Sequence, residues 1–211
     1  MSIVRVYDEE EVESPFDLPG MSEQLLIDVL ISSEGIRAEA TDIDAPTRGG
    51  TEAYFAKVRE LRIGLLPFGW TYSNASNYCT TISPCRGHAI AVAAGTWGTG
   101  LVHPTPETAR SMGEVTTRVV EVNQVQLSLF NSPVIARQEQ PLTWLLLSHR
   151  AGDRLYAELS LPDGQTENGV VCTWRQRFVL SPSDLGPSVF RSRRDDGEPA
   201  PAIDVPVALR R

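Results

Sequence analysis

Lysine is almost absent from this sequence, which has one lysine, Lys57, among its 19 basic residues. The 27 acidic residues outnumber the basic ones, and the net charge of the 211-residue chain is −8 at pH 7. A nucleic acid or an anionic membrane surface binds a basic face, from which counterions are released. The charge balance therefore argues against both classes of partner.

Cysteine is also scarce, and long apolar runs are missing. Three cysteines are too few for a disulfide framework in a chain of this length, which favours a reducing compartment. No window approaches the ~18 consecutive apolar residues of a membrane span, and the first residues lack the pattern of a signal peptide. We therefore expect a soluble, cytoplasmic protein.

The two ends of the chain differ in composition from its middle. Residues 8–13 contain five acids, and because like charges at that density repel one another, we predict a solvated acidic arm over residues 1–20. Residues 187–211 are rich in proline, arginine and aspartate and are predicted as a second arm. The remaining residues, 21–186, are expected to form a single β-rich domain.

Part of the C-terminal arm has the pattern of a strand. Large apolar residues occupy every second position, at Ile203, Val205, Val207 and Leu209, and alternate with Ala, Asp and Pro. Pro206 has no N–H to donate, so such a strand belongs at a sheet edge. We predict that residues 199–211 dock as an edge strand, on their own sheet or on that of a neighbouring subunit, and that their deletion lowers stability.

Alternation of apolar and polar residues predicts most of the domain as short strands. The predicted strands cover residues 25–31, 36–40, 61–66, 78–82, 88–94, 124–129, 144–147, 155–161 and 172–180. The first two of these are predicted to form a hairpin. A helix is predicted from Thr51 onward, with Tyr54, Val58 and Leu61 on one face, and residues 107–112 are predicted to form one or two helical turns.

These short strands are separated by Gly, Pro and Asn, and no βαβ spacing recurs, which favours a mainly β protein. We expect an antiparallel β-sandwich or a partly open β-barrel with one or two short helices. Trp144 and Trp174 lie within strongly apolar strand patterns and are expected in the core.

The densest group of chemically active residues comprises Cys79, Cys85, His88 and His103. Zinc binds Cys thiolates and His imidazoles in tetrahedral sets, so these four residues are an alternative zinc site. Their spacing matches no standard zinc finger, however, and free cysteines are usually buried as apolar side chains. The first expectation is therefore a protein without a cofactor.

A second hypothesis makes Cys85 a nucleophile with His88 or His103 as its general base, next to Arg86, which would favour the thiolate. No acidic or amide residue stands at a spacing that would orient the histidine. The catalytic residues are therefore unknown, with Cys85 and His88 as candidates.

A third group contains candidate residues for binding a ligand or partner. Residues 95–100 are rich in glycine but lack the Gly-Lys-Ser or Gly-Lys-Thr sequence of a phosphate-binding P-loop, which predicts a mobile loop. Trp97 at its centre is either an anchor for a ligand or partner or a cover for the core. Trp70 and His103 complete this group.

Because the sequence contains no convergent catalytic set, the first functional hypothesis is a non-catalytic binding or assembly module of a cytoplasmic multi-protein system. It would bind a protein partner or associate with itself. The alternative is a small enzyme with a β-walled apolar pocket for a small molecule, either cyclase- or isomerase-like or a hydrolase that uses Cys85 and His88.

The two hypotheses predict different structures. A pocket enzyme should have an enclosed cavity with Trp70, Trp97 or His103 at its mouth. A binding module should have a filled core and an exposed apolar patch or an unpaired sheet edge.

Overall fold

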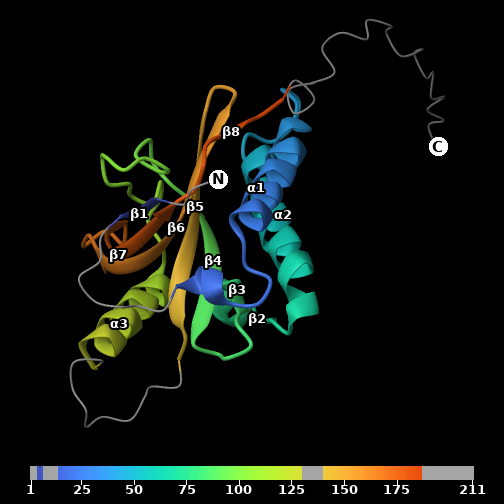
Figure 1. Ribbon diagram of the computed structural model, residues 1–211. Helices are drawn as coiled ribbons and strands as arrows, with labels where there is room; N and C mark the ends of the chain where they lie inside the picture. The colour runs from blue at the N-terminus through green and yellow to red at the C-terminus, as the bar shows by residue number, and fades with distance from the viewer. Residues whose placement is uncertain (1–3, 7–13, 130–139, 187–211) are drawn as a thin grey trace, which may run out of the picture.

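A mixed β-sheet with helices on both faces forms the body of the protein (Figure 1). The computed structural model describes residues 4–6, 14–129 and 140–186. The strands are β1 (Val4–Val6), β2 (Thr71–Ser73), β3 (Thr80–Ile82), β4 (His88–Ala94), β5 (Leu142–Ala151), β6 (Arg154–Gln165), β7 (Val171–Val179) and β8 (Ser183–Asp184). The helices are α1 (Glu23–Ala38), α2 (Arg48–Leu65) and α3 (Glu114–Leu129), with short 3-10 helices η1 (Pro15–Asp17), η2 (Leu66–Phe68) and η3 (Ala75–Asn77).

Seven strands lie side by side in the order β1-β7-β6-β5-β4-β3-β2, and β8 pairs with β6 as well. The pair β4–β5 is parallel, and the other pairs are antiparallel. The predicted antiparallel meander is confirmed for β5, β6 and β7, and Gly152 and Asp153 form the tight turn between β5 and β6. Since α3 lies between the parallel strands β4 and β5 in the chain, the described part of the sheet contains one βαβ unit, although the sequence shows no recurring βαβ spacing.

The expected fold class is confirmed only in its coarse form. The protein is built on a sheet, but the sheet is open, with 34% helix against 30% strand, so neither a sandwich nor a barrel is established. Three helices of 16, 18 and 16 residues stand where one or two short ones were expected. The acidic run at 8–13 and the predicted C-terminal strand at 199–211 lie outside the described residues. Within the predicted N-terminal arm, however, Val4–Val6 forms β1, which pairs with β7.

The hairpin predicted over residues 25–40 is wrong, because this segment forms α1. The buried residues of α1 follow a helical stripe, whereas Leu25 and Ile31 of the period-two pattern are only partly buried. The buried residues are Glu23, Leu26, Ile27, Val29, Leu30, Ser33 and Glu34. The Ser22 hydroxyl accepts a hydrogen bond from the Leu25 amide (3.1 Å) and so caps the helix N-terminus. Because Glu23, Ser33 and Glu34 in this stripe are polar, the apolar residues alone do not show the helical period of 3.6 residues.

The helix predicted from Thr51 is confirmed in type, although α2 begins three residues earlier, at Arg48. Residues 61–65, predicted as a strand, are the end of α2, where Leu61 and Leu65 are buried one turn apart. Residues 124–129 belong to α3 rather than to a strand, and residues 107–112 form no helix. Thr108 instead pairs with Gly95 in an isolated β-bridge.

Two apolar clusters, one on each face of the sheet, form the core. The larger cluster lies between the sheet and α1 and α2, and includes Trp70, Trp144 and Phe178. The smaller cluster packs Trp174 and Leu145 of the sheet against Val120 of α3. The prediction that Trp144 and Trp174 are core residues is confirmed, and the two rings lie in different clusters.

Candidate functional site

The structure places the predicted cysteine and histidine candidates in different surroundings. His88 is buried, and its Nδ1 accepts a hydrogen bond from the Trp144 indole (3.0 Å). Cys85 is exposed, with its Sγ 3.2 Å from the Ser83 hydroxyl. His103 is exposed in the loop before Pro104. Nδ1 of His88 is thus used in a hydrogen bond to the buried Trp144 ring. The role of Cys85 as a nucleophile stays a hypothesis.

Metal ligands are the second possibility for these residues. Within residues 4–6, 14–129 and 140–186, no three side chains of His, Cys, Asp or Glu come together as a metal-binding group. Cys79 is half-buried and lines a surface groove, whereas His88 is buried in the core and does not line that groove.

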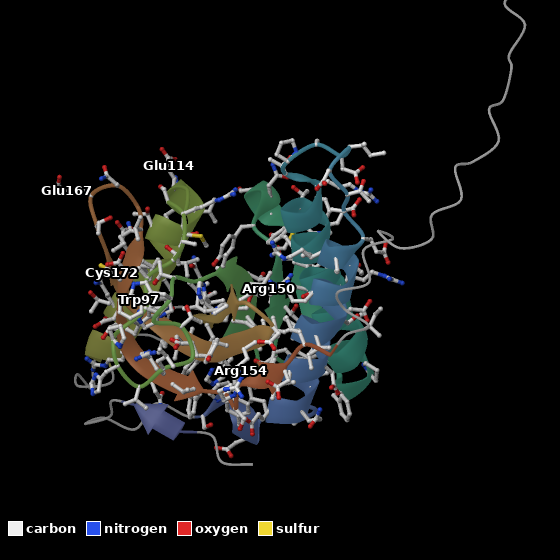
Figure 2. The ribbon with its side chains drawn as sticks, turned by 90° about the horizontal axis from the view of Figure 1, so that it is seen from above. Trp97, Glu114, Arg150, Arg154, Glu167 and Cys172 are labelled. Atoms are coloured by element: carbon white, nitrogen blue, oxygen red, sulfur yellow. The ribbon has the colours of Figure 1, made fainter. Side chains whose placement is uncertain are left out.

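The tryptophan candidates also separate. Trp70 is buried in the larger core cluster, and its indole donates to the Pro19 carbonyl (2.7 Å), so it offers no exposed ring to a ligand. Trp97 is 68% exposed, on the side of the molecule away from α1 and α2 (Figure 2). The interpretation of Trp97 as a cover for the core is therefore wrong, whereas its role as an anchor stays a prediction.

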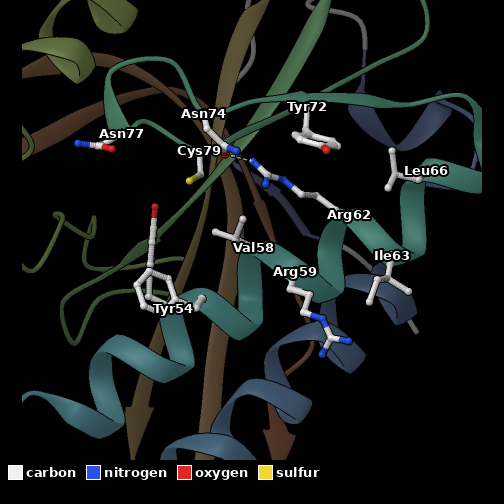
Figure 3. Close-up of a pocket in the computed structure, with 11 residues that line it drawn as sticks. Tyr54, Val58, Arg59, Arg62, Ile63, Leu66, Tyr72, Asn74, Asn77 and Cys79 are labelled. Atoms are coloured by element: carbon white, nitrogen blue, oxygen red, sulfur yellow. Dashed lines mark hydrogen bonds between the residues drawn. The ribbon is translucent and has the colours of Figure 1, made fainter.

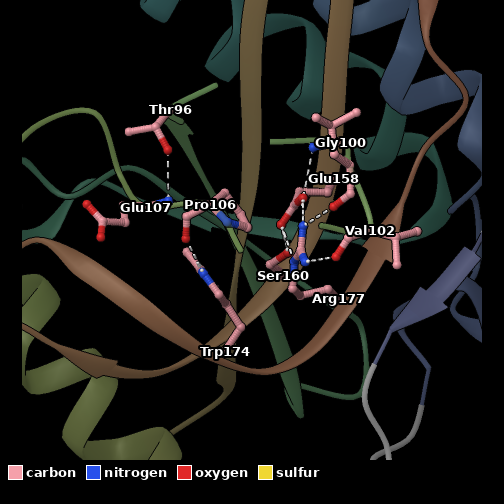
Figure 4. Close-up of polar contacts among 10 residues, drawn as sticks. Thr96, Gly100, Val102, Pro106, Glu107, Glu158, Ser160, Trp174 and Arg177 are labelled. Carbon is pink, nitrogen blue, oxygen red and sulfur yellow. Dashed lines mark hydrogen bonds and ion pairs between the residues drawn. The ribbon is translucent and has the colours of Figure 1, made fainter. Parts of the chain in front are cut away.

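A buried ion pair holds the loop that carries Trp97 (Figure 4). Arg177 Nε donates to Glu158 Oε1 (2.9 Å), and the Gly100 amide donates to Glu158 Oε2 (2.9 Å). Arg177 Nη2 also donates to the Leu101 carbonyl (2.8 Å). Because the charges and the loop backbone satisfy one another, this part of the glycine-rich segment is fixed to the sheet rather than free to close on a phosphate.

The single lysine lies in a second buried polar cluster, which joins α1 and α2 to β5. Lys57 Nζ donates to the Ser148 hydroxyl (2.8 Å) and lies 3.7 Å from Glu34 Oε1. Arg37 and Arg150 approach the same carboxylate from the surface. Burial lowers the pKa of Lys57, and the nearby Glu34 carboxylate partly opposes that shift.

We expect Lys57→Met to change how stability depends on pH. In wild type the pKa of Lys57 is lower in the folded than in the unfolded state, so the unfolded chain binds more protons between these two values. The free energy of unfolding should therefore rise with pH more in wild type than in the variant, up to the ordinary lysine pKa of ~10.4. Urea unfolding at a series of pH values measures this, and a pH-independent difference would contradict it.

An open groove lies between α2 and the segment that contains β2 and η3 (Figure 3). Its volume is about 760 Å³. The lining residues are Tyr54, Phe55, Val58, Arg59, Arg62, Ile63, Leu66, Tyr72, Asn74, Asn77 and Cys79. We call this surface the α2 groove.

Large apolar side chains of the α2 groove are exposed to solvent. Phe55 is 61% exposed, Ile63 50% and Tyr72 54%. Phe55 and Ile63 lie on α2, and Tyr72 lies on β2. Two other lining residues, Tyr54 and Val58, pack against the larger core cluster, in which Leu61 and Leu65 of α2 are buried. Helix α2 therefore presents apolar side chains on two sides, one packed and one open.

Two contacts define the polar part of the α2 groove. Arg62 stacks over the Tyr72 ring, with its guanidinium carbon 4.4 Å from the ring centre, and donates through Nη2 to Asn74 Oδ1 (2.7 Å). Burial raises the pKa of Tyr54 to about 12, and a hydrogen bond to Cys79 adds to the shift. At neutral pH the Tyr54 hydroxyl is therefore protonated, and the charges of the groove are those of its arginines.

Sequence reasoning did not find the α2 groove, although Cys79 was named as a zinc candidate and Tyr54 and Val58 were placed on a helix face. The available signal was Phe55 and Ile63, two large apolar residues outside the predicted apolar face of this helix. Such residues indicate that a helix contacts apolar groups on more than one side.

Comparison of the chain with family models, curated proteins and solved structures finds no match in any of the three. Among the described helices, none combines the length and apolarity that a membrane crossing requires.

Proposed function

We propose that the protein is a non-catalytic binding or assembly module whose α2 groove binds a segment of a protein partner. The observation that carries this proposal is the exposure of Phe55, Ile63 and Tyr72 along one continuous groove. On soluble proteins, contiguous exposed apolar side chains mark interaction sites. Apolar side chains without such a role are exposed singly and are scattered over the surface.

Three further features support a binding module over a pocket enzyme. Large buried side chains pack on both faces of the sheet, with Trp144 in one core cluster and Trp174 in the other. Strand β2, which forms one wall of the groove, stands at the end of the described sheet, where an edge strand is open to another chain. Trp70, Trp97 and His103, expected at the mouth of an enzyme pocket, do not line this groove.

The test is Ile63→Glu, with Ile43→Glu as a matched control. The same substitution places a charge in the groove in the first case and on the 96% exposed Ile43, outside the groove, in the second. A charge in an apolar interface should weaken partner binding by at least about tenfold, as expected for a central contact.

Affinity capture from the source cell, with quantification of each captured protein, measures the effect. The expected result is a set of proteins that wild type and Ile43→Glu retain and Ile63→Glu loses. Equal recovery with both variants, at unchanged melting temperatures, would reject the groove as the binding site.

A further inference from the structure

The α2 groove has a charge opposite to that of the protein as a whole. The chain has a net charge of −8, yet the groove lining contains two arginines, Arg59 and Arg62, and no Asp or Glu. The Arg59 side chain is 74% exposed, and its Nη1 lies 3.4 Å from Glu60 Oε1. Exposed ion pairs of this kind are weak, so Arg59 remains available to a stronger partner.

The hydrogen bonding of Arg62 indicates the same chemistry. Its Nη2 donates to Asn74 Oδ1 (2.7 Å) and lies within 3.2 Å and 3.5 Å of the Ser73 and Thr80 carbonyls, but its Nε–H is shielded from water and has no acceptor among the described residues. An unmet guanidinium N–H in such surroundings is unfavourable. A carboxylate is the group whose two oxygens match the guanidinium edge, and stacking on Tyr72 holds that edge in a fixed plane.

The order of side chains along the groove sets the pattern of its occupant. Phe55 stands toward one end, Leu66 toward the other, and the two arginines lie between them on successive turns of the helix. From Tyr54 to Leu66 the helix rises by about 18 Å, which matches about five or six residues of an extended chain or about twelve of a helix.

We infer that the occupant of the α2 groove is a protein segment with apolar side chains on both sides of a central Asp or Glu. This inference rests on the proposed function and adds the chemistry of the partner to it. The apolar side chains would cover Phe55, Ile63 and Leu66, and the carboxylate would pair with Arg59 and Arg62. An acidic segment without apolar neighbours would be repelled by the rest of the protein, because the net charge is negative.

A displayed library of random 12-residue peptides, selected on the full chain, tests the inference. The expected result is enrichment of peptides in which Asp or Glu lies between apolar residues. One such peptide, labelled with a fluorophore, should bind wild type and Ile43→Glu equally and Ile63→Glu at least about tenfold more weakly.

The acidic contact is then measured by a double substitution cycle. Changing the central Glu of the peptide to Gln should weaken binding to wild type by about five- to tenfold, and this difference should shrink in Arg59→Gln. Arg59 is chosen because its exposed side chain can be replaced without disturbing the contacts that Arg62 makes with Asn74 and Tyr72. Arg62→Gln provides the second variant.

The outcomes separate the inference from the proposed function. Peptides that depend on Ile63 but show no preference for an acid would overturn the inference and leave the binding function intact. Peptides that bind Ile63→Glu as well as wild type would overturn both. A library without enrichment would overturn the inference, and the capture experiment with Ile63→Glu and Ile43→Glu then decides the proposed function. Self-association that Ile63→Glu abolishes, in the absence of acidic peptide binding, would make the occupant a second copy and overturn the inference.

Discussion

Replacing Arg177 with Met is expected to lower the free energy of unfolding by about 3–5 kcal/mol, because it leaves the Glu158 carboxylate buried without its cation. Both side chains of the pair are 0% exposed. Ser160 Oγ (2.6 Å) and the Gly100 amide (2.9 Å) also donate to Glu158, but neither carries a charge that replaces the guanidinium. Urea unfolding followed by circular dichroism measures the loss.

Arg154→Met is the matched control for this prediction. Arg154 pairs with Asp184 at 3.1 Å on the protein surface, where solvent screens the charges, so no measurable change is expected. A double variant, Arg177→Met with Glu158→Leu, should be more stable than Arg177→Met alone, because it removes the unpaired charge. Wild-type stability of Arg177→Met would show that the buried pair does not hold the fold.

The strands that sequence analysis predicted correctly are those whose local pattern reflects burial on the faces of the sheet, and the uninterrupted apolar run at 144–147 reflects burial on both. In β5, Trp144 and Leu146 enter the larger cluster, while Leu145 and Leu147 enter the smaller one. In β6 the turn at Gly152 and Asp153 fixes the register with β5. These signals are local, since a strand and its turn lie within a few residues, so they can be read from the sequence.

The helices α1 and α3 were missed because polar residues on their buried faces have partners far away in the chain. Glu23 of α1 is buried, and its carboxylate accepts a hydrogen bond from the Ser181 amide (2.7 Å), 158 residues away. Asn123 of α3 exchanges hydrogen bonds with the Thr143 backbone at the start of β5. A hydrophobic pattern counts such residues as exposed, since burial of a polar group depends on partners that the local sequence does not contain.

The candidate site was missed for a related reason. The α2 groove forms only when β2, η3 and α2 come together, so Arg62 and Tyr72, ten residues apart, stack in a way that spacing alone does not predict. Clustering along the chain drew attention to Cys85 and His88 instead. The fold gives these two different environments, with His88 bonded to Trp144 in the core and Cys85 at the surface.

Trp174→Ala is expected to lower the free energy of unfolding by about 3–5 kcal/mol, the range for removing a large buried side chain. The ring is buried between the sheet and α3, where it packs in one cluster with Leu145 and Val120. Its indole N–H also donates to the Pro106 carbonyl (2.8 Å), so the residue joins the Trp97 loop to the core. Trp174→Phe, which retains a ring but loses this donor, should cost about 1–3 kcal/mol.

Trp97→Ala is the matched control for Trp174→Ala, since it makes the same substitution on a side chain that is 68% exposed. Its effect on stability should stay within about 0.5 kcal/mol, as for other surface positions. Urea unfolding of the three variants beside wild type measures these differences. Equal losses for Trp97→Ala and Trp174→Ala would mean that the exposed ring packs as tightly as the buried one, and would contradict the assignment of Trp174 to the core beneath α3.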